Sequence, residues 1–292
     1  MFAASLSAAF TRASVDHTFS ALSNSNFHYL FSDYFEHIRI RPQPRYLFRQ
    51  DRETDMYNAI QMVQPDLLVV SMIWLPLLPI LHELPGTKVF LARISPDRWW
   101  RIEDKDGKEL RFDPAWYDHA FVIEPNAGLT WGTETEPLVV CNTDEAVGAE
   151  DARAVLGAEP GRKTCVVAQN GYAGELQRLL DRNGLQPEEY QTIALENVFE
   201  GRNVFPLAKY MRGIDFLVGG AGYNLFYEAR FFDTAAHFAP FERNGDDQFR
   251  RIKVNRDYSF TRNGADQIVE RILEDRGSTF GYTATGVQVG PL

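Results

Sequence analysis

A short turn rich in glycine, Gly219-Gly220-Ala221-Gly222, separates an apolar segment from a segment with the pattern of a helix. A backbone without side chains can come close to a ligand, and the start of a helix presents free N–H groups to an anion. The turn could therefore hold a phosphate group, although it lacks the GxGxxG spacing of dinucleotide-binding proteins. The alternative is a tight turn that only packs a helix closely on a sheet.

Glu228 lies one helical turn beyond Asn224, on the same face of the expected helix. A carboxylate beside an anion-binding turn is suited to accepting hydrogen bonds from ribose hydroxyls. A solvated charge on the helix surface is the alternative. The next apolar strand leads into the polar loop 238–248, at the carboxyl edge of the expected sheet, where open α/β folds bind ligands.

The pattern Gly222-x5-Glu228-x11-Pro240-Phe241-x6-Gln248 resembles the donor-binding half of the GT-B glycosyltransferases, particularly the N-acetylglucosaminyltransferase of peptidoglycan synthesis. The resemblance implies an α/β chain with two Rossmann-like domains facing each other across a cleft. It also implies a hexosyltransferase-like enzyme that moves a sugar from a nucleotide-sugar donor to an unknown acceptor. The donor that it favours is a UDP-sugar. The likeness extends weakly over residues 10–275 and is specific only over 215–250.

On this resemblance, the C-terminal half binds the donor. Glu228 would bind the ribose, Gln248 would face the sugar, and N–H groups of the glycine-rich turn would stabilise the leaving diphosphate. The donor-binding residues that it implies are Asn170, Gly171, Gly219, Gly220, Ala221, Gly222, Tyr223, Asn224, Glu228, Phe241, Arg243, Asp247 and Gln248.

The charged residues of this region have alternative interpretations. Arg243 could pair with a diphosphate through its planar fork, or it could share a solvated basic surface with Arg250, Arg251 and Lys253. Asp247 and its neighbour Asp246 could bind sugar hydroxyls or could be ordinary loop charges. Because the two are adjacent and do not form Asp-x-Asp, we expect sugar transfer without a divalent metal. The resemblance also implies no cofactor other than the nucleotide-sugar itself.

An inverting transfer needs a general base that deprotonates the acceptor hydroxyl. The best carboxylate candidate is Asp97, which follows the expected strand 87–92. The histidines of the first half do not follow a glycine-rich loop. Trp99 and Trp100 could stack on a sugar or a lipid, but we favour packing in the core.

Strands alternate with helices on both sides of an acidic stretch at 144–159, which favours βαβ units and parallel sheets. We therefore expect an N-terminal acceptor-side domain over 1–145 and a nucleotide-sugar-binding domain over 146–292. GT-B enzymes open with an apolar strand and a glycine-rich loop, whereas this chain starts within the helix that follows them. The first domain thus looks one strand short, and 277–292 has the composition of a tail.

The 30 Lys and Arg residues and 40 Asp and Glu residues give a net charge of -10, which argues against broad binding to nucleic acid or to anionic membranes. No apolar stretch is long enough to span a bilayer, although peripheral membrane contact stays open. Cys141 and Cys165 lack metal-site spacing, and Cys165 lies in an apolar strand, where it should be buried. We expect a cytoplasmic protein of undetermined oligomeric state.

Two other functions fit the same residues. One is a nucleotide-sugar hydrolase or epimerase of the same fold. The other is a non-catalytic nucleotide-sugar-binding subunit whose acceptor half lies on another chain.

Overall fold

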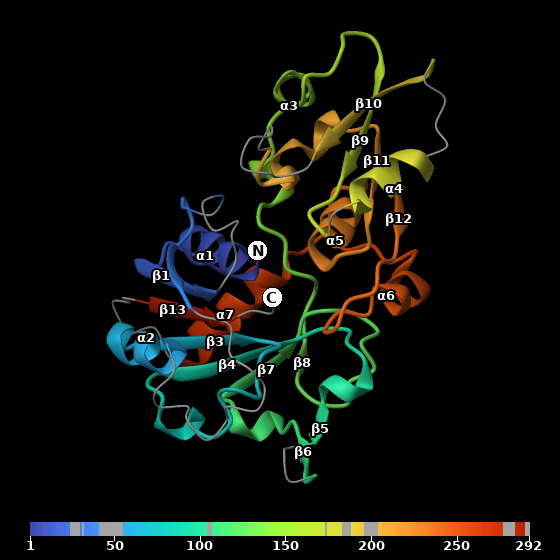
Figure 1. The fold of residues 1–292 in the computed structure, drawn as a ribbon. Coiled ribbons are helices and arrows are strands. Elements are labelled where there is room, and N and C mark those ends of the chain that lie inside the picture. Colours follow the sequence, from blue (N-terminus) through green and yellow to red (C-terminus); the bar gives the residue numbers. More distant parts are fainter. Residues whose placement is uncertain are drawn as a thin grey trace. The chain divides into compact units, whose positions relative to one another are not determined.

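The computed structural model describes residues 1–23, 30, 32–40, 55–103, 107–172, 174–182, 188–195, 204–276 and 284–289. Within these residues the chain forms two compact α/β units with parallel sheets (Figure 1), which confirms the predicted fold class. Unit 1 comprises Met1–Pro137, Asn244–Asp247 and Gly264–Leu292, and unit 2 comprises Leu138–Arg243 and Gln248–Asn263. From its apolar pattern, the sequence also predicts strands that end at Arg41 and Glu196, a helix that begins at Glu53 and a helix that ends at Asn183. These four residues lie outside the described residues, as does His28, one of the histidines of the first half.

Unit 1 is built on a parallel sheet with the strand order β2-β1-β13-β3-β4-β7-β8. Every residue of β3 is buried, as expected for an apolar strand that is covered on both faces. The strands are β1 (His17–Ser23), β2 (Glu36–Arg39), β3 (Leu67–Ser71), β4 (Thr87–Ala92), β7 (His119–Val122), β8 (Thr133–Glu134) and β13 (Ala284–Val289).

Strand β13 comes from the segment for which the sequence predicts a tail. It lies between β1 and β3 and runs parallel to both, with Val287 opposite Ser20 on one side and Leu68 on the other. The position between β1 and β3 is therefore filled by a strand that follows all of unit 2 in the sequence.

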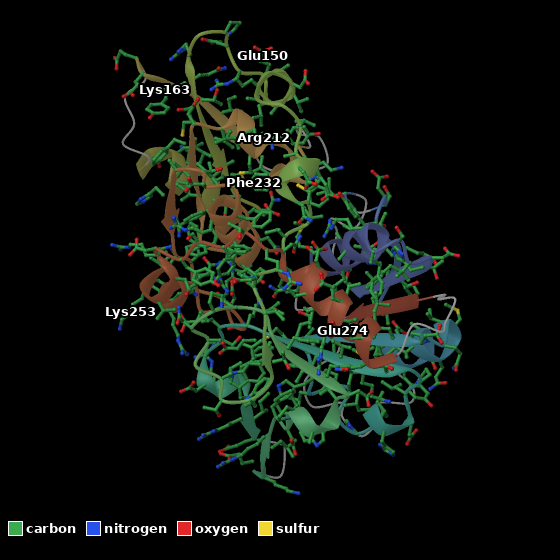
Figure 2. The ribbon with its side chains drawn as sticks, turned by 180° about the vertical axis from the view of Figure 1, so that it is seen from behind. Glu150, Lys163, Arg212, Phe232, Lys253 and Glu274 are labelled. Carbon is green, nitrogen blue, oxygen red and sulfur yellow. The ribbon has the colours of Figure 1, made fainter. Side chains whose placement is uncertain are left out.

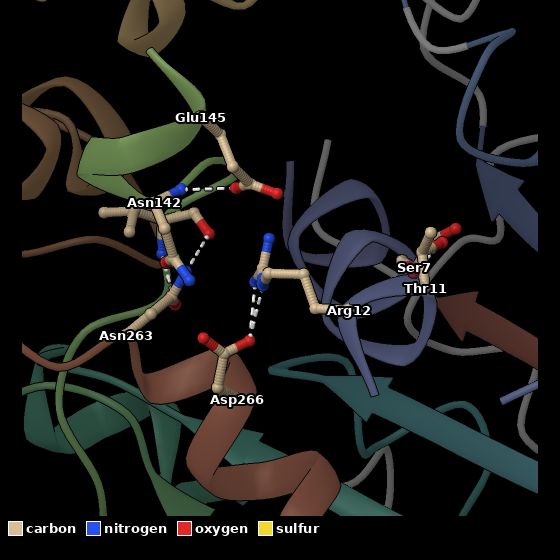
Figure 3. A network of polar contacts seen from close by, with 8 residues as sticks. Ser7, Thr11, Arg12, Asn142, Glu145, Asn263 and Asp266 are labelled. Atoms are coloured by element: carbon tan, nitrogen blue, oxygen red, sulfur yellow. Dashed lines mark hydrogen bonds and ion pairs between the residues drawn. The ribbon is translucent and has the colours of Figure 1, made fainter. Parts of the chain in front are cut away.

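The helices of unit 1 come from both ends of the chain as well. Helix α1 (Phe2–Arg12) buries Phe2, Leu6 and Phe10, whose spacing places them on one face. It packs on β1, on β13 and on α7 (Gly264–Arg276), and Arg12 pairs with Asp266 of α7 at 2.6 Å (Figure 3). Residues 264–292 thus count with unit 1, whereas the sequence predicts one domain over 146–292. The remaining elements are α2 (Asp55–Val63), the antiparallel pair β5 (Arg101–Glu103) and β6 (Glu109–Arg111), and the 3-10 helices Leu81–Glu83, Asp97–Trp99 and Pro114–Trp116.

Unit 2 contains a second parallel sheet, with the order β10-β9-β11-β12. Its core joins apolar residues of β9 and β11 to residues of the flanking helices, as Val166 and Leu217 pack with Leu156 and Ala229. The elements are the 3-10 helix Thr143–Glu145, α3 (Ala149–Leu156), β9 (Lys163–Ala168), α4 (Glu175–Arg182), β10 (Tyr190–Leu195), the 3-10 helix Leu207–Gly213, β11 (Phe216–Gly220), α5 (Tyr223–Phe231), β12 (Ala236–Ala239) and α6 (Gln248–Asn255).

Two segments that are distant in the sequence lie side by side in unit 2. The buried Asn263 donates from Nδ2 to the Val139 carbonyl at 2.9 Å and to Asn142 Oδ1 at 2.8 Å, and its Oδ1 accepts from Val139 N at 3.2 Å (Figure 3). One amide side chain therefore satisfies both polar groups of the Val139 backbone, as a neighbouring strand would.

Candidate functional site

The carboxyl edge of the unit 2 sheet brings together most of the residues that the sequence singles out. Strands β9, β11 and β12 are parallel and in register at this edge, with Gly219 opposite Ala168 and Gly220 opposite Ala239. The segments that follow these strands, 169–175, 221–222 and 240–243, therefore start from the same edge, where ligands bind in open α/β sheets.

A buried carboxylate, Glu175 at the start of α4, organises the first of these segments. It accepts hydrogen bonds from Gln169 Nε2 at 2.6 Å and from the Tyr172 N–H at 3.1 Å, and it binds both Nη atoms of Arg243. Burial alone would raise the pKa of the Glu175 carboxyl, but the hydrogen bonds from Arg243 and Gln169 outweigh it and lower that pKa. Glu175 is therefore ionised, and it joins the segment after β9 to the segment after β12.

Gln169 extends this network to the glycine-rich turn, because its Oε1 accepts from the Gly220 N–H at 3.2 Å. Two glycines are needed for this close packing. A Cβ on Gly171 would lie 1.8 Å from Glu175 Oε2, and one on Gly220 would lie 2.5 Å from Gln169 Oε1. Asn170, in contrast, is exposed.

The turn itself leaves the start of α5 open. Gly222 is the N-cap residue of α5, and among the described residues no side chain caps the helix. The first N–H groups of a helix have no partner within it, so they can bind an anion. A Cβ on Gly222 would meet no atom within 4 Å, which shows that the turn has open space beside it. Tyr223 is buried, and its hydroxyl accepts from the Leu138 N–H at 2.9 Å, so it packs within unit 2.

Glu228 is buried in α5, with 3% of its surface exposed, so the alternative of a solvated surface charge is wrong. Within the described part of the chain, its Oε1 has no hydrogen-bond partner. Burial raises the pKa of Glu228 to about 8. A buried oxygen without a partner is costly, and a hydroxyl group from a ligand could satisfy it.

Gln248, at the start of α6, is buried, and its Oε1 accepts from the Phe241 N–H at 2.9 Å. It therefore fixes the backbone where β12 leaves the sheet. Asp247 belongs to the segment Asn244–Asp247, which packs with unit 1: its N–H lies 3.5 Å from the Ile94 carbonyl, and Asp246 pairs with Arg93 at 3.3 Å. The cluster of unit 2 side chains described above does not include Asp247.

The other candidates of the first half lie in unit 1. Asp97 is exposed at the start of a 3-10 helix that follows β4. Trp99 donates from Nε1 to the Met72 carbonyl at 2.9 Å, and its ring is 3.0 Å from the Cβ position of Gly245. Trp100 packs with Phe112 and Trp131. The contacts of both tryptophans support packing, the interpretation that we favour from the sequence.

Three further residues of this edge are absent from the predicted set: Gln169, Glu175 and Arg251. Gln169 directly follows a strand and Glu175 begins a helix. Both are positions at the carboxyl edge of a parallel sheet, where the sequence could have indicated a binding residue. The sequence allows Arg251 to be part of a solvated basic surface, but the residue is fully buried, so that interpretation is wrong for Arg251.

Both cysteines are buried and free, and burial raises the pKa of the Cys165 thiol to about 11, as suits a core residue. No group of metal-binding side chains occurs among the described residues. In the same part of the chain no helix has the length and apolar character needed to cross a membrane.

No protein-family model and no curated protein matches the chain. Solved structures do match. The glycosyltransferase SsfS6 of Streptomyces sp. SF2575, complexed with thymidine diphosphate, has a TM-score of 0.55 and 12% identity over 88% of this chain and 82% of its own. The spinosyn rhamnosyltransferase SpnG, complexed with spinosyn aglycone, has a TM-score of 0.52 and 14% identity over 86% of this chain and 80% of its own. The chain therefore has the fold of the GT-B glycosyltransferases, as its sequence pattern predicts.

Proposed function

We propose that this protein is a glycosyltransferase that takes its sugar from a nucleoside-diphosphate donor bound at the carboxyl edge of the unit 2 sheet. One observation carries the proposal: α5 starts from an uncapped turn that ends at Gly222, and the same helix carries Glu228, a buried carboxyl group one helical turn beyond Asn224 whose Oε1 has no partner among the described residues. An anion-binding turn next to a hydroxyl acceptor suits a ribose diphosphate.

The fold supports this proposal. The similar structure of SsfS6 is a complex with thymidine diphosphate, and SsfS6 is a glycosyltransferase. In our chain the N–H groups at the start of α5 would face the diphosphate and stabilise the charge that develops as it leaves. Glu228 would accept a hydrogen bond from a ribose hydroxyl, and Gln248 would position the loop after β12.

Unit 1 would bind the acceptor, which is unknown, and Asp97 is the first candidate for the base of an inverting reaction. We propose that the reaction needs no divalent metal, because the two acids of the 244–247 loop are adjacent and do not form Asp-x-Asp. Addition of a chelator should then leave the rate of donor consumption unchanged.

The decisive experiment is calorimetric titration of the protein with UDP, TDP and GDP. Binding of at least one diphosphate is expected. Above pH 8 it should be weaker in Glu228→Gln than in the wild type, because the Glu228 carboxyl group is then ionised and a carboxylate is a better acceptor than an amide for a ribose hydroxyl. A folded protein that binds none of the three would overturn the proposal.

Product analysis then separates transfer from the alternatives of hydrolysis and epimerisation. The donor that binds is incubated with water as the only acceptor, and the sugar is identified. Rapid release of free sugar would indicate a hydrolase, and a changed sugar still attached to the nucleotide would indicate an epimerase. Donor binding without any product, also with acceptor extracts, would indicate a binding subunit.

A further inference from the structure

Arg251 of α6 is fully buried, with 0% of its surface exposed. A guanidinium keeps its charge in proteins, and burial of a charge costs several kcal/mol unless other interactions offset it. Arg251 donates from Nη1 to the Ala221 carbonyl at 2.8 Å, and its guanidinium carbon lies 5.7 Å from the centre of the Tyr223 ring. The buried charge is thus placed directly at the turn between β11 and α5.

This hydrogen bond determines how the turn presents its backbone. Ala221 donates its N–H to the Ala239 carbonyl at 3.0 Å and accepts from Arg251, so the residue is held on both sides. In a trans peptide unit the C=O and the following N–H point in opposite directions. Because the Ala221 carbonyl is directed at Arg251, the Gly222 N–H points away from the guanidinium.

We propose that Arg251 is a positioning residue for the donor diphosphate. It orients the Ala221–Gly222 peptide so that the Gly222 N–H is available to a phosphate oxygen, and it adds a fixed positive charge behind the turn. A fixed charge and a pre-oriented N–H stabilise a diphosphate without reorganisation when the leaving group develops charge. This inference rests on the proposed function, because it assumes that the diphosphate binds at this turn.

The test compares the affinities of three variants for UDP and TDP and for the nucleosides uridine and thymidine, which lack phosphate. Arg251→Met removes the charge and the donor, Arg251→Gln keeps a donor without the charge, and Lys253→Met removes an exposed charge of the same helix (Figure 2). We expect Arg251→Met to weaken diphosphate binding about tenfold or more and to leave nucleoside binding within about twofold of wild type. Arg251→Gln should show a smaller loss, and Lys253→Met should bind as wild type does.

A role that is only structural would weaken the diphosphate and the nucleoside alike, and this result would overturn the inference. Wild-type diphosphate affinity in Arg251→Met would overturn it too. If Arg251→Met does not fold, as judged by circular dichroism, Arg251→Gln decides in the same way: it must lose affinity for the diphosphate only. A wild-type protein that binds no diphosphate would overturn the proposed function itself, whereas binding that Arg251 does not affect would overturn this inference alone.

Discussion

Arg243 binds Glu175 through two parallel hydrogen bonds, from Nη1 to Oε1 at 2.8 Å and from Nη2 to Oε2 at 2.6 Å. The Arg243 guanidinium carbon also lies 4.6 Å from the centre of the Tyr172 ring and 5.6 Å from that of Phe241. From the sequence, Arg243 could pair with a diphosphate or belong to a solvated basic surface; in the structure its fork is occupied by a carboxylate of its own unit. Arg243 therefore holds together the segments 169–175 and 240–243 at the carboxyl edge of the unit 2 sheet.

The first prediction concerns the energy of this pair. In a double-mutant cycle with Glu175→Gln and Arg243→Met, we expect a coupling energy of about 2 kcal/mol, because the carboxylate is buried and the pair is bidentate. Urea denaturation gives the four free energies of unfolding. The matched control is the exposed pair Glu159–Arg162, at 3.0 Å, which should couple by no more than about 0.5 kcal/mol. Equal coupling in both pairs would contradict the prediction.

The second prediction compares two glycines. Gly171→Ala would place its Cβ 1.8 Å from Glu175 Oε2, and since that oxygen is held by hydrogen bonds, it can move only by losing them. We expect a loss of about 2 kcal/mol in the free energy of unfolding. Gly222→Ala has a φ of -62° and open space, so its stability should stay within about 0.5 kcal/mol of wild type.

Although Gly222→Ala should hardly change the stability, it should weaken the binding of a diphosphate. A methyl group on the turn would obstruct the approach of a phosphate to the backbone, so we expect UDP or TDP affinity to fall about tenfold. Calorimetric titration measures this affinity, and thermal unfolding measures the stability. Unchanged affinity in Gly222→Ala would place the diphosphate elsewhere.

The third prediction is a dependence of stability on pH that arises from Glu228. Burial raises the pKa of this carboxyl group from 4.5 to about 8, so the folded protein keeps a proton that the unfolded chain loses. The stabilisation is fully present below pH 4.5 and is lost as the pH rises to about 8, with a slope of about 1.4 kcal/mol per pH unit. Glu228→Gln cannot release a proton and should lack this component.

Urea denaturation of both proteins at several pH values in this range gives the difference directly. Because all other titrating groups are shared, the difference between the two pH profiles isolates Glu228. Parallel profiles for wild type and Glu228→Gln would show that the pKa of Glu228 is ordinary.

The fourth prediction tests the position of β13. Val287 lies opposite Ser20 and Leu68, so it is within the ladder on both sides. Val287→Pro removes a backbone donor from the middle of a sheet and should destabilise unit 1 by about 3 kcal/mol or more. Val287→Ala keeps the N–H and serves as the control. Hydrogen exchange should show faster exchange of the β1 and β3 amides in the proline variant only.

The sequence predicts the local elements well, because the hydrophobic pattern of a strand or helix is contained within it. The buried run Leu67–Ser71 and the turn before α5 are examples. Burial of charged residues could not be predicted in the same way. Glu228 and Arg251 look like surface residues in their own segments, and only the elements that cover them in the fold make them buried.

Contacts between segments that are distant in the sequence could not be predicted from local patterns either. The contact between Glu175 and Arg243 joins two segments separated by β10, β11 and β12, and neither segment carries a motif that specifies the other. For the same reason the sequence predicts only a tail where β13 forms, since an isolated six-residue strand gives no information about the strands beside it.

The position of β13 also affects how the protein forms during synthesis. The strands β1 and β3 are made early, but the strand that separates them is made only after all of unit 2, residues 138–243 and 248–263. Unit 2 can therefore complete its sheet on the ribosome while β1 and β3 each still expose an unpaired edge. Since these two edges could pair wrongly with each other, the rate at which β13 arrives should influence the yield of correctly folded protein.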